Sequence, residues 1–314
     1  MLHSFTYESV MTLPRGVANS TAAMGKKAKA TTISRWRMRP AYAVAGLVLM
    51  ALLGLWQAQV DEASHGFRVP SPQFQLPSDR RVHVLGSYPH DPSAFTQGLL
   101  VESPGILIES TGLYDKSSVR RVNATSGDVL LHASPFPSDA FGEGIALNSA
   151  NDTYIALTWQ SRMLYVLDKT DFRVVAAKPF GSTRNEGWGI TAMESSSLVV
   201  SDGSHVLHFW DAHTLIETRQ VVVRTANGHP VRHLNELEYA RGHIYANVWY
   251  SNAILKIDPA TGVVVASYDL STLCTNAHRD AVLNGIAYDD AHDVFFITGK
   301  LWDTMYLVQF DESN

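Results

Sequence analysis

The chain has 314 residues, of which 46% are hydrophobic and 18% charged, so it can bury a large core and is not disordered throughout. A formal net charge of −5 and a pI near 6.2 give no electrostatic basis for binding nucleic acid. The single cysteine, Cys274, excludes an internal disulfide.

The first 40 residues differ from the rest in charge. They contain seven basic residues (Arg15, Lys26, Lys27, Lys29, Arg35, Arg37 and Arg39) and one acid, Glu8. The segment has little hydrophobic periodicity. We therefore expect residues 1–40 to be an exposed, disordered cytosolic tail.

An apolar run follows from Ala41 to Trp56, and Ala58 and Val60 extend it past two glutamines. A helix of about 20 residues crosses a bilayer, so residues 41–60 are expected to form a transmembrane signal anchor. The basic flank places the N-terminus in the cytosol and the remainder in the lumen of the secretory pathway or outside the cell. A cleaved signal peptide and a buried soluble helix are the alternatives. The proline-containing segment 61–79 is expected to be a stalk, with the globular domain at 80–314.

Beyond the stalk, a Gly- or Asn-led turn opens into an apolar strand five times. The equivalent positions are Leu99, Ile145, Ile190, Leu237 and Ile286, at intervals of 46, 45, 47 and 49 residues. A repeat of this length filled with short strands is typical of a β-propeller. The sequence therefore predicts an all-β, five-bladed propeller, whereas a β-sandwich, the alternative fold, would not explain the period.

Each repeat is predicted to be a four-stranded antiparallel meander. The fifth lacks its outer strand, because little sequence remains after Phe310. The segment Arg81–Tyr88 precedes the first repeat and has no partner there. We expect it to complete blade five and so to close the ring without an exposed edge.

In such a blade, the turn that enters the first strand and the loop after the second strand lie on one face. This places a set of polar and aromatic side chains around the mouth of the central channel: Gln97, Glu109, Glu143, Trp159, Glu186, Trp188, Asp202, Asn235, Trp249, Lys300 and Trp302. An aromatic cavity with a few polar groups indicates a small-ligand site. Glu143, between Gly142 and Gly144, would be partly desolvated there, which favours a raised pKa suited to proton transfer.

Several of these residues also have structural interpretations. Gly98, Gly144 and Gly189 are expected where blades pack closely. Asp202-Gly203 is more typical of a hairpin turn than of a catalytic group, and Glu109 could cap a loop. His229 and His233 have an H-x₃-H spacing but no neighbouring third ligand.

The motifs AFTQGL, FGEGI, EGWG, LNELEY, NVW, VLNGIAYD and TGKLW occur in the order found in plant-type (papaya-type) glutaminyl cyclotransferases, and the chain resembles that family from about His90 to Leu307. The resemblance implies a five-bladed propeller that converts N-terminal glutamine of peptides into pyroglutamate with release of ammonia, without a catalytic metal or cofactor.

The resemblance also implies roles for single residues. Glu143 would be the acid/base, assisted by Lys300 and Asn235. The substrate-binding positions would be Phe95, Gln97, Phe141, Trp159, Trp188 and Trp249. Asp115 stands where the family usually has glycine, and we expect it to tolerate a left-handed backbone conformation.

Two functions from other classes compete with this one. A membrane-tethered, non-catalytic propeller could bind peptide N-termini or sugars in the same mouth. A hydrolytic or lactonase propeller would need several carboxylate ligands for a central metal, which Lys300 would oppose. The remaining expectations are a monomer, and glycosylation at the sequons that begin at Asn123 and Asn151 if the domain is lumenal.

Overall fold

The computed structural model describes residues 81–194, 196–274, 276 and 278–311. The tail, anchor and stalk predicted for residues 1–79 lie outside this part of the chain. Within the described residues, no helix is long and apolar enough to cross a membrane.

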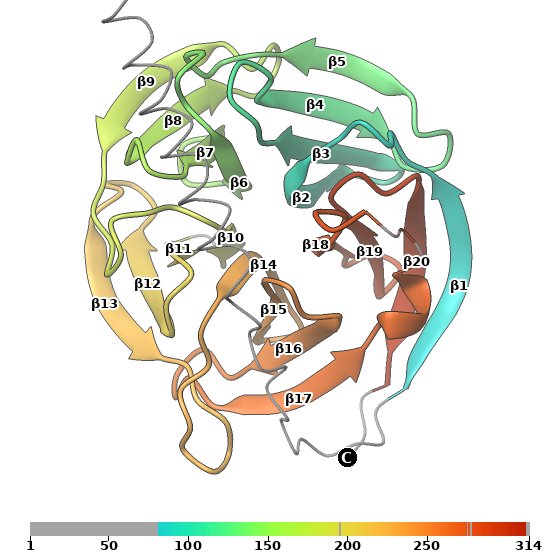
Figure 1. The fold of residues 1–314 in the computed structure, drawn as a ribbon. Helices are drawn as coiled ribbons and strands as arrows, with labels where there is room; N and C mark the ends of the chain where they lie inside the picture. Colours follow the sequence, from blue (N-terminus) through green and yellow to red (C-terminus); the bar gives the residue numbers. More distant parts are fainter. Residues whose placement is uncertain (1–80, 195, 275, 277, 312–314) are drawn as a thin grey trace, which may run out of the picture. The chain divides into compact units, whose positions relative to one another are not determined.

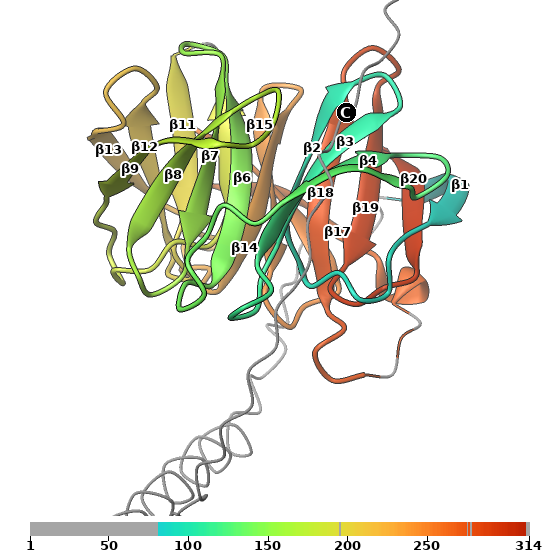
Figure 2. The same ribbon diagram turned by 90° about the horizontal axis from the view of Figure 1, so that it is seen from above.

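The strands form five separate four-stranded antiparallel sheets. Figure 1 shows these sheets as blades around a common centre, and Figure 2 shows the same strands from the side. Blade one contains β2 (Thr96–Ser103), β3 (Ile106–Thr111), β4 (Ser118–Asn123) and β5 (Val129–Ala133). Blade two contains β6 (Gly142–Asn148), β7 (Thr153–Thr158), β8 (Met163–Asp168) and β9 (Val174–Pro179).

Blade three contains β10 (Ile190–Met193), β11 (Ser197–Ser201), β12 (Val206–Asp211) and β13 (Glu217–Val222). Blade four contains β14 (Leu234–Ala240), β15 (His243–Val248), β16 (Ala253–Ile257) and β17 (Val264–Asp269), followed by a 3₁₀ turn, η1 (Ser271–Leu273). Blade five contains β18 (Leu283–Asp289), β19 (Val294–Gly299) and β20 (Thr304–Phe310). The predicted five-bladed propeller is confirmed.

The outer strand of blade five comes from the other end of the domain. Strand β1 (Val82–Pro89) pairs antiparallel with β20, from Val82 opposite Phe310 to Pro89 opposite Thr304. Figure 1 shows β1 along the outside of the last blade. The predicted closure of the ring by this segment is therefore confirmed, and the edge of β20 is covered.

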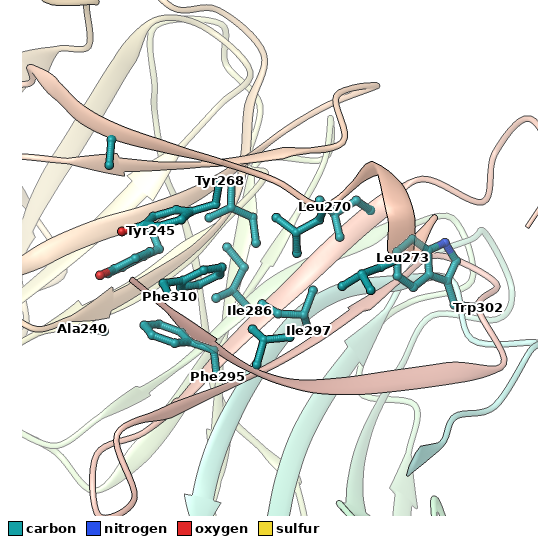
Figure 3. Packing of buried hydrophobic residues seen from close by; sticks show 14 of the residues in the cluster. Ala240, Tyr245, Tyr268, Leu270, Leu273, Ile286, Phe295, Ile297, Trp302 and Phe310 are labelled. Atoms are coloured by element: carbon teal, nitrogen blue, oxygen red, sulfur yellow. The ribbon is translucent and has the colours of Figure 1, made fainter. Parts of the chain in front are cut away.

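In the described residues the apolar core consists of five clusters, one at each junction between neighbouring blades. Figure 3 shows part of the cluster between blades four and five, where the rings of Tyr268 and Phe310 stack 4.3 Å apart beside Phe295. The junction between blades five and one has a smaller cluster around Leu99, Phe296 and Met305. Blade-to-blade packing therefore supplies the core, as expected when each sheet is apolar on both faces.

Glycines allow the innermost strands to meet. A Cβ added at Gly189 would lie 2.2 Å from the Asn235 carbonyl oxygen, and one at Gly144 would lie 2.8 Å from the Trp188 carbonyl oxygen. The Gly144 amide also donates a hydrogen bond of 2.7 Å to that Trp188 carbonyl, which joins blades two and three. The expected packing role of these glycines is confirmed. Asp115 has φ +62°, so the expected left-handed conformation is found as well.

Candidate active site

One cavity of about 170 Å³ opens at the mouth of the channel. The residues that line it are Phe95, Phe141, Glu143, Trp159, Trp188, Asn235, Trp249, Tyr250, Asp280, Val282 and Lys300. They come from the segments that enter β2, β6, β10, β14 and β18 and from the loops that leave β7, β15 and β19. The two sets of loops therefore converge on one mouth, as the blade topology predicts.

Irregular pairing directs the side chains at this mouth. The register between the first and second strands shifts between Gly142 and Ile145, between Leu234 and Leu237, and between Leu283 and Ile286. Such a bulge changes the direction of a side chain and is common beside active sites. Glu143 and Asn235 both lie within these shifts, so their side chains escape the simple alternation of a strand.

Backbone contacts from the preceding blade hold the two polar residues in place. The Ser110 hydroxyl in blade one donates to the carbonyl oxygen of Glu143 at 2.5 Å. The Ser201 hydroxyl in blade three donates to the carbonyl oxygen of Asn235 at 2.6 Å. The positions of Glu143 and Asn235 therefore depend on the packing of each blade against the preceding one.

The carboxyl of Glu143 is desolvated. Its residue is 6% exposed. Burial raises its pKa well above the usual value, the negative charge of Glu186 raises it further, and Lys300 opposes both effects. A carboxyl with a raised pKa is the kind of group that serves as a general acid or base.

Lys300 supplies the cation of the site. Its Nζ lies 4.9 Å from the centre of the Phe95 ring. Burial lowers the pKa of Lys300 to about 8, against the opposing charges of Glu143 and Asp280. Asn235 adds hydrogen-bonding capacity, because its Oδ1 is buried without a hydrogen-bond partner among the described residues.

Aromatic rings contact one another around these polar groups. Phe141 packs edge to face with Phe95 at 6.0 Å and with Trp159 at 5.9 Å. Trp188 packs edge to face with Trp249 at 5.5 Å. These rings form apolar walls against which an aliphatic group can pack.

Five of the residues predicted to surround the mouth do not line the cavity. Gln97 is buried, and its Oε1 accepts a hydrogen bond of 3.4 Å from Asn284 Nδ2. Trp302 is buried, and its indole N–H donates to the Ala281 carbonyl. Asp202 accepts hydrogen bonds from the backbone amides of Arg184 and Ser204, which supports the turn interpretation.

Glu109 also lies outside the lining, and the expectation that it belongs to a loop was wrong. It lies within β3, opposite Arg120 in β4, and belongs to a buried ion network between blades. Glu186 is also outside the lining, behind two of the tryptophans. Conversely, the cavity is lined by three residues that were not predicted from the sequence: Tyr250, Asp280 and Val282.

The motif LNELEY carries two glutamates, the buried Glu236 and the partly buried Glu238, that sequence reasoning did not single out. Glu236 Oε2 accepts a hydrogen bond of 2.9 Å from the Ile286 amide, and Glu238 Oε1 accepts one of 2.8 Å from the Tyr288 amide. Both carboxyls thus join blade four to blade five. Burial raises the pKa of Glu238 to about 8 and that of Glu236 well above its usual value.

The described part of the chain has no group of three or more His, Cys, Asp or Glu residues arranged to hold a metal ion. The fold and the cavity define a β-propeller with an aromatic small-ligand site, in which a buried carboxyl can transfer protons.

Comparison with known proteins shows to which family this β-propeller belongs. The sequence pattern of the glutamine cyclotransferase family matches residues 49–310. The glutaminyl-peptide cyclotransferase of Arabidopsis thaliana is 38% identical over 238 residues, which are 74% of this chain and 72% of the relative. The crystal structure of Myxococcus xanthus glutaminyl cyclase matches with a TM-score of 0.67 and 33% identity, over 75% of this chain and 98% of that one. The chain belongs to the glutamine cyclotransferase family.

Proposed function

We propose that this protein is an acyltransferase that converts the N-terminal glutamine of peptides and proteins into pyroglutamate and releases ammonia. The observation that carries the proposal is the desolvated carboxyl of Glu143 in an aromatic cavity whose walls also hold Lys300 and Asn235. The family supplies the reaction, and these side chains supply a means of performing it.

In the proposed reaction, the substrate α-amine attacks the carbon of its own γ-carboxamide. The new N–C bond closes a five-membered ring, and the C–N bond to the amide nitrogen breaks. The attacking amine must be neutral and must lose a proton, which the Glu143 carboxylate accepts and then passes to the departing nitrogen. A positioned acid/base of this kind accelerates a reaction by about 10²- to 10⁴-fold.

The other residues that line the cavity would stabilise the negative charge that develops on the substrate and hold the substrate in a folded conformation. In this proposal, Lys300 and the side-chain N–H group of Asn235 donate to the amide oxygen as it gains negative charge. Phe95, Phe141, Trp159, Trp188 and Trp249 would hold the methylene stem of the substrate folded onto its amine, which reduces the entropy that ring closure must overcome. No step requires a metal or a cofactor.

The test is ammonia release and the matching mass loss from a Gln-initiated dipeptide, with and without a chelator. We expect chelator-resistant turnover that Glu143→Gln abolishes while its thermal melting curve stays close to that of the parent protein. Peptide binding without ammonia release would favour a non-catalytic binding module. Near-normal turnover by Glu143→Gln would eliminate the proposed mechanism.

We also propose that the basic segment 1–40 and the apolar segment 41–60 direct the domain into the secretory pathway as a membrane-anchored monomer. The sequons offer a check on this topology. Asn151 lies in an exposed turn between β6 and β7, and Asn123 ends β4 beside an exposed turn. Expression of the full chain in a eukaryotic cell, followed by fractionation, glycosidase treatment and light scattering, tests anchoring, lumenal exposure and oligomeric state.

A further inference from the structure

Glu186 lies behind the cavity and contacts two of its walls with one atom. Its Oε2 accepts hydrogen bonds from Nε1 of Trp159 at 2.9 Å and from Nε1 of Trp188 at 2.8 Å. Trp159 follows β7 in blade two, and Trp188 precedes β10 in blade three. A single carboxylate oxygen therefore connects aromatic side chains from neighbouring blades.

Local hydrogen bonds hold the backbone of Glu186 in place. The Ser182 hydroxyl donates to the Glu186 carbonyl oxygen at 2.8 Å and accepts from the Glu186 amide at 3.1 Å. The next amide, that of Gly187, donates to the Trp159 carbonyl oxygen at 3.1 Å. The turn that carries Glu186 is thus fixed to the loop that carries Trp159, independently of the two indole contacts.

The contacts of the two indoles extend this effect around the cavity. Trp188 packs against Trp249, and Trp159 packs against Phe141. Because a buried indole N–H needs an acceptor, loss of the shared carboxylate would release both rings to seek other partners. Four of the six aromatic residues that line the cavity would then lose their fixed spacing.

Glu186 also acts on the buried acid through its charge. Burial is the main cause of the raised pKa of Glu143, and the charge of Glu186 adds to it while Lys300 opposes it. Arg184 only partly offsets Glu186, since its Nη2 lies 3.9 Å from Glu186 Oε1 and its side chain is 45% exposed. Glu143 is therefore subject to the opposing charges of Glu186 and Lys300.

We propose that Glu186 is a positioning residue, which sets the distance between the tryptophans that enclose the glutamine side chain and acts on Glu143 through its negative charge. The inference rests on the proposed cyclisation. It adds a residue that neither lines the cavity nor touches the reacting atoms.

The test compares Glu186→Gln with Glu186→Ala in the full chain. The glutamine variant keeps an oxygen that can accept both indole N–H groups but removes the charge. We expect its KM to stay near that of the parent protein, while the limb of the kcat/KM profile that reports Glu143 moves to lower pH. The alanine variant removes the acceptor as well, and we expect KM to rise about tenfold, the usual scale for losing a hydrogen bond to a charged group.

Glu194→Gln is the matched control. It removes the same charge from an exposed turn in the same blade, beyond the end of β10. We expect this control to leave both KM and the pH profile unchanged. Near-UV circular dichroism of the ligand-free proteins reports indole packing without reference to turnover, and we expect a changed spectrum only for Glu186→Ala.

A Glu186→Gln profile that superimposes on the parent profile would overturn the electrostatic role. An alanine variant with parental KM and an unchanged near-UV spectrum would overturn the positioning role. If the parent protein releases no ammonia, the proposed function fails. The near-UV spectrum and the affinity for a Gln-initiated peptide, measured by tryptophan fluorescence, would then still show whether Glu186 holds Trp159 and Trp188 in position.

Discussion

His90 and Glu109 form a buried ion pair at the junction that closes the ring, with Nε2 of His90 3.0 Å from Oε1 of Glu109 and each side chain 1% exposed. The other ring nitrogen of His90 lies 2.7 Å from the Trp302 carbonyl oxygen in blade five. Both nitrogens thus face acceptors, which requires a protonated imidazole. Arg120 bonds the second oxygen of Glu109. This network reinforces the junction that has the smaller apolar cluster.

The first prediction concerns the stability of that junction. Removing one partner of a buried ion pair leaves the other charge uncompensated, which typically costs about 3–5 kcal/mol. We therefore expect Glu109→Gln to lower the free energy of unfolding by about 3 kcal/mol in urea denaturation. Glu102→Gln is the control, because its pair with Arg121 is more exposed, at 18% and 21%, and should lose less. Equal losses in both variants would contradict the prediction.

The same network predicts a pH dependence of stability. Burial alone would raise the pKa of Glu109, but His90 and Arg120 outweigh it and hold this pKa at about 2, below its usual 4.5. Burial alone would lower the pKa of His90, yet Glu109 raises it above 6.5. The stabilisation from Glu109 is lost as pH falls from 4.5 towards 2, and that from His90 is lost as pH rises through its raised pKa. We expect Glu109→Gln to remove most of the change above pH 6.5, measured by thermal melting.

The third prediction concerns Glu238, whose pKa of about 8 exceeds the usual value of 4.5 because the carboxyl is buried. The folded protein binds this proton more tightly than the unfolded chain does, so its stabilising effect is complete below pH 4.5 and is lost as pH rises through about 8. Glu238→Gln should therefore raise the free energy of unfolding at pH 8 relative to the parent protein. At pH 4 the two should be nearly equal. A variant that is equally destabilised at both pH values would show that the carboxyl serves only as a hydrogen-bonding group.

The fourth prediction concerns Lys300. Burial lowers its pKa to about 8, so its positive charge is lost as pH rises through this value. If the proposed role is right, kcat/KM falls above pH 8. Lys300→Arg keeps its charge to higher pH. We expect this variant to be slower, because the guanidinium differs in shape, but to show its alkaline fall at clearly higher pH. If the fall of kcat/KM at alkaline pH is unchanged in Lys300→Arg, a group other than Lys300 causes it.

The fifth prediction compares two glycines in the same connection. A methyl group at Gly189 would lie 2.2 Å from the Asn235 carbonyl oxygen, whereas Gly181 has no neighbouring atom within 4 Å of an added Cβ. Overpacking against backbone costs about 1–3 kcal/mol or more. We expect Gly189→Ala to lower both stability and turnover, since it displaces Asn235. Gly181→Ala should leave both nearly unchanged in melting and ammonia assays.

Much of this architecture could be predicted from the sequence because every blade repeats the same pattern of a turn followed by an apolar strand. The period of Leu99, Ile145 and their equivalents fixed the number of blades, and the unpaired segment before blade one indicated the closure. The turns around Glu143 and Asn235 indicated the mouth. The roles of these residues in chemistry stay predictions.

The sequence was less informative where pairing or loop length departs from the repeat. Glu109 stands beside a Ser-Thr-Gly turn in the sequence, but its strand continues to Thr111 and directs it into the junction. Asp280 and Val282 lie in the connection between β17 and β18, which contains the 3₁₀ turn η1; the described connections that follow blades two and three contain no such turn. The two indole contacts of Glu186 depend on the conformation of a turn, which no hydrophobic period encodes.

The pairing of Val82 with Phe310 places both ends of the described domain in one sheet. A short linker could therefore join them, and a new start could be opened at Gly105, in the hairpin between β2 and β3, where φ is +76° and no atom lies near an added Cβ. That hairpin is at the end of blade one opposite the cavity. A circularly permuted chain that begins there would contain the same five junctions and the same cavity, so the order of the blades along the gene could change without changing the site.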